Sequence, residues 1–173
     1  MEWEIPLDDE TLSEYAQRIS RKVTHKNPVL VGVSFGGILV QEMAQFLKPK
    51  KIIIISSVKS NVEFPTTFKL AKQTKAYKLI PTSLIENVYN LAQFTFGEKV
   101  IKRLKLYQMF LTVRDKKYLD WSIEKIILWD RIKANPNVIH IHGDADEVFP
   151  IKYIKDCIVV KGGTHIMVLT QYK

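Results

Sequence analysis

Residues 29–40, with the sequence VLVGVSFGGILV, constrain the fold of this chain more than any other stretch. An apolar run ends at Ser34, and an apolar helical pattern follows it. The flanking glycines, Gly32 and Gly36, keep neighbouring side chains away from a tight strand-to-helix turn. The following helix points its N-terminal amides and the positive end of its dipole at the serine, which favours negative charge there. The pattern therefore predicts a strand, a sharp turn at Ser34 and a helix.

A second strand is expected directly after this helix. The helix is predicted over about residues 37–47 and ends at Lys48-Pro49, because the residue before a proline is driven out of the helical region. Residues 51–56, KIIIIS, form a β-branched run typical of strands buried on both faces of a parallel sheet. Two strand–helix units in succession predict an α/β fold, a mostly parallel sheet with helices on both faces.

The first 23 residues are expected to add a short strand and a helix. Trp3 and Ile5 alternate with glutamates, which predicts a strand that Pro6 ends. The acids at 8–10 suit a helix start. Apolar residues then recur at helical spacing, namely Leu12, Tyr15, Ala16, Ile19 and Val23.

Residues 59–135 are rich in lysine, aromatics and helical spacing, and Pro65 and Pro81 divide them into short helices. The interpretation is a helical cap, residues 59–135, inserted into a core made of residues 1–58 and 136–173. Two helix faces are expected, at Leu106, Met109, Phe110 and Val113, and at Leu119, Ile123, Ile126 and Ile127. The cap aromatics are either ordinary core or walls of a pocket; they are Phe94, Phe96, Trp121 and Trp129.

The strand pattern returns at 138–142 and 158–160. An acidic turn, residues 143–150, follows the first of these strands, and a glycine-rich loop ending in His165 follows the second. A final apolar stretch covers 166–169. Because ligands of open α/β sheets bind at the carboxyl ends of the strands, these loops and Ser34 are expected to share one edge.

A serine, an acid and a histidine in this order, each on a loop after a strand, resemble the α/β-hydrolase superfamily and its small capped esterase-type members. The matching segments are 32–36 (GVSFG), 142–146 (HGDAD) with Pro150, and 162–165 (GGTH). The resemblance implies that Ser34 is the nucleophile, His165 the general base and then acid, and Asp146 the acid that orients the imidazole. It also implies that the backbone N–H of Phe35 is an oxyanion donor and that no cofactor is needed.

Two alternatives concern the acidic turn. Asp144 competes with Asp146 for the role of the acid, and is otherwise a turn residue that bonds local backbone. His140, His142 and Asp144 spell HxHxD, which resembles the metal-binding run of metallo-β-lactamase-like hydrolases. That run continues with a histidine where this chain has Ala145, so no metal is predicted. His140 is then a core residue, and His142 makes a structural hydrogen bond beside the turn.

The chain departs from the family before Ser34. Residues 1–31 contain no glycine, and no His-Gly pair precedes the serine, although the family takes its second oxyanion amide from such a loop. The chain also stops soon after His165. We therefore expect an N-terminally truncated version of the fold. The strand at 29–33 would lack a neighbour, which the 3–5 strand or a second copy of the chain, as a homodimer, could replace.

Composition and charge exclude several other classes of function. The net charge is +8 over 173 residues, but the basic residues are scattered along helical stretches such as 99–105, so no nucleic-acid partner is predicted. The chain shows no signal peptide and no apolar run of about 20 residues, so no membrane span is expected. The single cysteine, Cys157, suits a reducing compartment, the cytoplasm.

The sequence thus predicts a cytoplasmic serine hydrolase that cleaves a carboxylic ester or related acyl bond of a small molecule through an acyl-enzyme. The main alternative is a catalytically impaired hydrolase-like module that binds or self-associates, and a basic interaction protein is the third.

Overall fold

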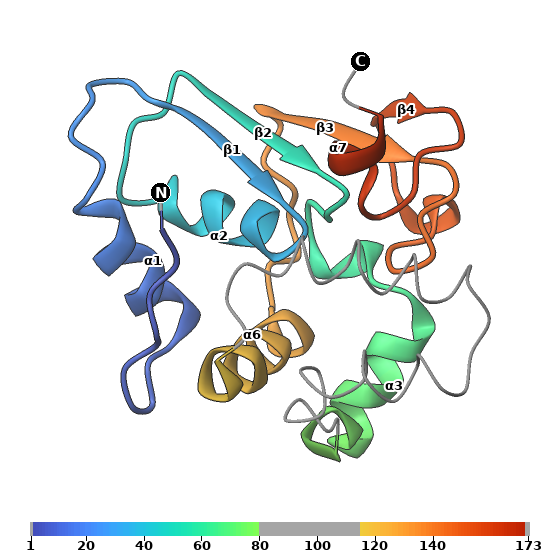
Figure 1. Cartoon of the computed structure of the whole chain (residues 1–173), viewed down its shortest axis with the longest axis horizontal. Helices are drawn as coiled ribbons and strands as arrows, with labels where there is room; N and C mark the ends of the chain where they lie inside the picture. The colour runs from blue at the N-terminus through green and yellow to red at the C-terminus, as the bar shows by residue number, and fades with distance from the viewer. Residues whose placement is uncertain (1, 80–114, 172–173) are drawn as a thin grey trace.

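Four parallel strands form one sheet in the order β1-β2-β3-β4 (Figure 1). In this computed structural model, which describes residues 2–79 and 115–171, the strands are β1 (Val29–Val33), β2 (Lys51–Ile55), β3 (Val138–Gly143) and β4 (Ile158–Val160). Leu30 lies beside Ile52, which lies beside Val138, and Ile141 lies beside Ile158. The prediction of a parallel α/β sheet is confirmed, and the carboxyl ends of all four strands lie at the same edge.

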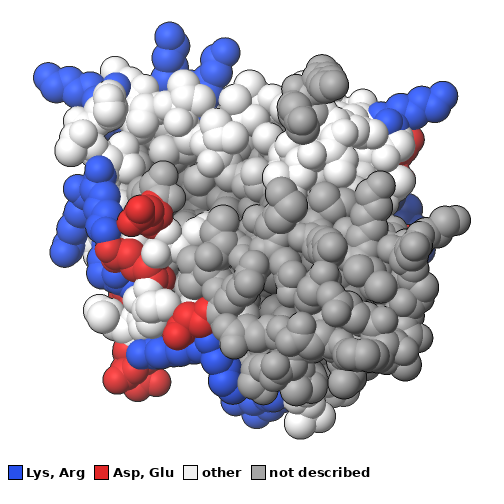
Figure 2. All heavy atoms as spheres, in the orientation of Figure 1, with Lys and Arg blue, Asp and Glu red and all other residues white. Residues whose placement is uncertain are grey.

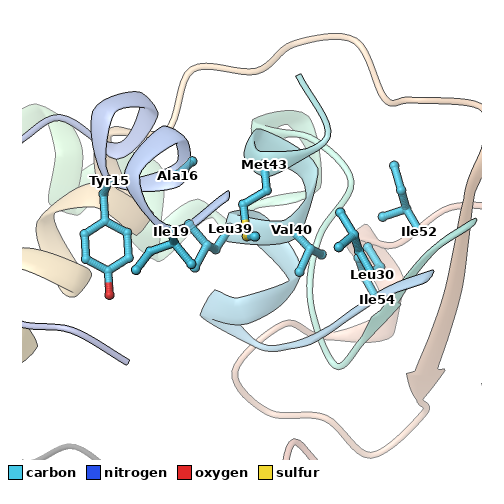
Figure 3. Close-up of a cluster of buried hydrophobic side chains, with 9 residues drawn as sticks. All are labelled: Tyr15, Ala16, Ile19, Leu30, Leu39, Val40, Met43, Ile52 and Ile54. Carbon is cyan, nitrogen blue, oxygen red and sulfur yellow. The ribbon is translucent and has the colours of Figure 1, made fainter. Parts of the chain in front are cut away.

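One face of the sheet is covered by two helices, α1 (Leu12–Ser20) and α2 (Phe35–Met43). Helix α2 connects β1 to β2 and packs on both strands, and α1 packs on α2. The buried cluster between them is shown in Figure 3 and comprises Tyr15, Ala16, Ile19, Leu30, Leu39, Val40, Met43, Ile52 and Ile54. Thr11 caps α1 through a capping box with Glu14, which satisfies backbone donors at the helix start.

The opposite face of the sheet is less covered at β1. Side chains alternate between faces along a strand, so Val29 and Val31 point away from α2, and they are 50% and 55% exposed. Near the carboxyl ends this face receives the loop that precedes α7 (Met167–Thr170). A Cβ atom on Gly143 would overlap the carbonyl group of Gly163 in that loop. The close approach of the two backbones therefore requires glycine at 143.

A second cluster lies beyond the strand ends. Here α6 (Lys116–Leu128) contacts α2, α3 (Thr66–Thr74) and the short helix η2 (Ala76–Leu79), and Phe64 joins the cluster directly after the short helix η1 (Asn61–Glu63). Its buried members are Phe35, Ile38, Val58, Phe64, Tyr118, Leu119, Trp129 and Phe149. Leu119 and Ile127 of the face predicted for α6 are buried, whereas Ile123 and Ile126 are partly buried.

The predictions for Pro81, Phe94, Phe96 and the helix face at 106–113 lie outside the described residues.

The predicted strand at residues 3–5 is wrong. These residues form an extended arm without strand pairing, because Trp3 stacks on Phe35 with ring centroids 5.8 Å apart. The arm is tied to α1, since the backbone N–H of Glu4 donates to the hydroxyl of Tyr15 over 3.1 Å. Aromatic packing thus places the arm on the turn at Ser34 and not beside β1.

The bounds of two predicted helices also differ. Helix α1 ends at Ser20, before Val23, and α2 runs from Phe35 to Met43 instead of from 37 to 47. The apolar stretch at 166–169 forms most of the short helix α7. The 3-10 helix η4 (Ile151–Tyr153) follows the acidic turn.

Within residues 2–79 and 115–171, no helix combines the length and the apolar character that crossing a bilayer requires. On the face drawn in Figure 2, Lys and Arg side chains lie at several separate places around the rim, and acidic side chains lie among them on one side. The described part of this face therefore carries no continuous basic surface.

Candidate active site

Ser34 lies on the turn between β1 and α2, as the sequence predicts. Its backbone has φ 53° and ψ −121°, a conformation that non-glycine residues rarely adopt. Both backbone groups are held: Ser34 N–H donates to the carbonyl of Ile55 over 3.0 Å, and Ser34 C=O accepts from Gly37 N–H over 2.9 Å. The turn is therefore fixed by β2 on one side and by α2 on the other.

The glycines around Ser34 have different roles. A Cβ atom on Gly32 would overlap the carbonyl group of Gly36 and lie 2.6 Å from the nitrogen of Gly37. A Cβ on Gly36 would lie 3.6 Å from the ring of Trp3, an ordinary van der Waals distance. The close approach of β1 to the first turn of α2 therefore requires glycine at position 32 but leaves room at 36.

Ser57 is a residue that sequence reasoning missed. It is fully buried after β2, and its hydroxyl donates to the backbone carbonyl of Ser34 over 2.8 Å. This bond holds the turn from the neighbouring strand. The signal was the pair Ser56-Ser57 at the carboxyl end of an apolar strand, where buried hydroxyls need partners.

The structure brings three distant side chains into one hydrogen-bonded chain. His165 Nε2 lies 2.8 Å from Ser34 Oγ, and His165 Nδ1 lies 2.9 Å from Asp146 Oδ2. Because a carboxylate only accepts, Nδ1 carries the proton and Nε2 is free to accept the proton of the Ser34 hydroxyl. All three residues follow strands, namely β1, β3 and β4, so the shared edge of a parallel sheet explains how they meet.

Asp146 is held as a carboxylate. Burial alone would raise its pKa, but the hydrogen bond and charge of His165 outweigh burial and lower the pKa below its usual value. The backbone N–H groups of Val148 and Phe149 add to this effect by donating to Asp146 Oδ1 over 2.8 and 3.0 Å. The carboxylate can therefore orient His165 and stabilise its protonated form.

Asp144, the other candidate acid, bonds the backbone of Gly162. Its side chain is exposed, and Oδ1 accepts from the backbone N–H of Gly162 over 2.6 Å. The partner lies in the loop before His165, not in the acidic turn, so Asp144 ties the two loops together. Of the two candidate acids, Asp146 is the one that contacts His165.

Aromatic side chains pack around His165 and the acidic turn. The ring of Phe149 packs edge-on to His165, with centroids 5.5 Å apart, and Phe64 and Phe68 pack on Phe149. Trp121 and Trp129, which were candidates for pocket walls, donate their indole N–H groups to the carbonyl of Glu10 and to the carboxylate of Glu42, respectively.

No metal-type cluster is found near these residues. Within the ranges that the structure describes, no group of three or more His, Cys, Asp or Glu side chains could hold a metal ion. His140 and His142 bond each other, with 3.1 Å between Nε2 and Nδ1. Cys157 is a free, partly buried cysteine, and burial raises the pKa of its thiol.

No protein-family model matches this chain, and no curated protein matches it either. Several solved structures, in contrast, resemble it. A hydrolase from Pseudomonas aeruginosa gives a TM-score of 0.62 at 15% identity over 98% of this chain and 70% of its own. A putative non-heme bromoperoxidase from Mycobacterium tuberculosis gives a TM-score of 0.62 at 12% identity, over 96% of this chain and 71% of its own. A thermophilic esterase from Thermogutta terrifontis gives a TM-score of 0.56 at 14% identity, over 94% of this chain and 68% of its own. By sheet order, loop positions and these likenesses, the chain has the α/β-hydrolase fold.

Proposed function

We propose that the chain is a serine hydrolase that cleaves a carboxylic ester or a related acyl bond through an acyl-enzyme. The observation that carries the proposal is the continuous chain from Ser34 Oγ through His165 to Asp146, with distances of 2.8 and 2.9 Å. A serine hydroxyl is a poor nucleophile until a base within hydrogen-bond reach takes its proton. Here the base is in reach and its other nitrogen is held by a buried carboxylate.

The proposed reaction has two halves. Ser34 Oγ attacks the ester carbonyl carbon while His165 Nε2 takes the hydroxyl proton, and the protonated imidazole then gives that proton to the departing alcohol. The acyl group remains on Ser34. Water attacks it with His165 as base, and the acid product and free Ser34 result. Asp146 stabilises the imidazolium in both halves and does not itself take the proton.

The oxyanion site determines how fast this enzyme can be. Phe35 is the first residue of α2, where backbone N–H groups have no acceptor within the helix, so its amide is our candidate donor. Residues 1–31 contain no glycine that could form the family's second donor loop. Each oxyanion donor is worth about 100- to 1000-fold in kcat, so the turnover rate depends on which second amide joins that of Phe35.

The substrate is proposed to carry an apolar acyl or aryl group. Phe149 contacts His165, and Phe64 and Phe68 extend the aromatic surface toward α3. We propose that residues 59–135 form the cap that completes this apolar wall over the core of residues 1–58 and 136–173. The free thiol of Cys157 supports a reducing compartment such as the cytoplasm.

A fluorophosphonate probe tests the nucleophile. We expect the purified chain to gain one covalent adduct on the peptide that contains Ser34, because the probe reacts only with serines activated by a base. Intact-mass and peptide mass spectrometry measure the adduct. Ser34→Ala should not be labelled, whereas Ser13→Ala, at an exposed position of α1, should be labelled like the original chain. A folded chain that is neither labelled nor hydrolyses esters would favour the impaired binding module instead.

We also propose that β1 is the site of a homodimer. Among the strands that the structure describes it stands at the end of the sheet, and two of its valines are exposed, so it can pair with a second β1. Light scattering after size exclusion should give twice the chain mass at high concentration. Val31→Lys should shift the mass toward the monomer, whereas Val159→Lys, on the opposite edge strand β4, should not. A chain that is monomeric at every concentration would contradict this proposal.

A further inference from the structure

Two buried histidines that the proposed reaction does not use lie behind Asp146. His140 and His142 are two residues apart on β3, so they point to the same face of the sheet, and both are almost completely buried. His142 Nε2 lies 2.7 Å from the backbone carbonyl of Phe149, and His142 Nδ1 lies 3.1 Å from His140 Nε2. A carbonyl only accepts, so His142 Nε2 carries a proton and donates it to the Phe149 carbonyl.

Phe149 links this pair to the site. Its carbonyl accepts from His142, its N–H donates to Asp146 Oδ1 over 3.0 Å, and its ring packs on His165 with centroids 5.5 Å apart. The ring is almost completely buried. A displacement of Phe149 would therefore move both partners of the His165–Asp146 hydrogen bond.

We propose that His142 is a positioning residue that fixes Asp146 and His165 by holding the backbone of Phe149. The acidic turn is a loop, and His142 anchors its far end to β3, the strand from which the turn leaves. Without that anchor, the peptide group that donates to Asp146 can rotate. The role in turnover rests on the proposed function, whereas the effect on the His165–Asp146 bond does not.

The electrostatics of the pair agree with this role. His142 Nε2 also lies 3.6 Å from Asp146 Oδ2, the oxygen that accepts from His165, so a positively polarised N–H group lies close to the carboxylate. Burial, and next the neighbouring His142, lower the pKa of His140 to about 3. His140 is therefore neutral at pH 7 and adds no charge of its own beside His142.

The test compares two amides at position 142. Gln places its amide nitrogen near the position of Nε2, so His142→Gln should keep the bond to the Phe149 carbonyl, whereas the shorter side chain of His142→Asn should not reach it. We expect kcat to fall by about 10- to 100-fold in His142→Asn, with KM changed less than about threefold, and to stay within about threefold in His142→Gln. Proton NMR should show the far-downfield signal of the His165 Nδ1–H in the original chain and in His142→Gln, and lose it in His142→Asn.

Ile52→Ala is the control for general destabilisation, because Ile52 is buried on the same face of the sheet and does not touch the acidic turn. It should lower the melting temperature and keep the downfield signal. Retention of signal and kcat in a folded His142→Asn would overturn the inference, and so would equal losses in His142→Gln. If the original chain hydrolyses no ester, the hydrolase proposal fails, but the NMR comparison still decides the role of His142. If His142→Asn does not fold, His142→Phe takes its place, since it fills the volume without a donor.

Discussion

Asp146→Asn is expected to lower kcat for a p-nitrophenyl ester by about 10⁴-fold, or to the background of Ser34→Ala if that is reached first. The amide side chain has nearly the same shape, but its NH₂ group cannot accept from both His165 and the backbone. His165 Nδ1 would then lose its proton to Nε2, the wrong tautomer for a base that must accept from Ser34. Initial rates with short and medium acyl chains measure the effect.

Asp144→Asn is the matched control for this substitution. It lies in the same turn, but its carboxylate accepts from the N–H of Gly162 and does not contact His165, and it is exposed. A change of kcat within about threefold is expected, because only a surface hydrogen bond weakens. If Asp144→Asn removed activity and Asp146→Asn did not, the assignment of the acid would be wrong.

The parts of the site that the sequence predicts are those carried by local signals. Ser34 stands between an apolar strand and an apolar helix, and His165 follows a glycine pair after a short strand, so each pattern fixes its own loop. The parallel sheet then brings the loops to one edge. The preference for Asp146 over Asp144 came from the family resemblance, and their contacts depend on a loop geometry that spacing alone does not give.

What sequence reasoning missed depends on contacts between distant segments. Trp3 alternates with glutamates as in a strand, but its ring stacks on Phe35, which holds residues 3–5 at the turn that carries Ser34 and out of strand pairing. Ser57 looks like an ordinary loop serine until its hydroxyl is seen to hold the carbonyl of Ser34. Both are tertiary effects that override a local pattern.

Gly32→Ala is expected to lower the free energy of unfolding by at least about 3 kcal/mol, which is roughly 6 to 12 °C in melting temperature for a chain of this size. The new Cβ would overlap the carbonyl group of Gly36, and backbone atoms in the first turn of α2 cannot move aside as a flexible side chain can. Thermal unfolding followed by circular dichroism measures the change.

Gly36→Ala separates this steric effect from the general cost of replacing a glycine in the same motif. Its Cβ would meet only the ring of Trp3 at 3.6 Å, and alanine is the better helix former, so stability should change by less than about 1 kcal/mol in either direction. Equal destabilisation by the two substitutions would show that β1 and α2 do not approach as closely as the overlap at Gly32 requires. The difference between them therefore measures how tightly the turn that carries Ser34 is held against its own strand.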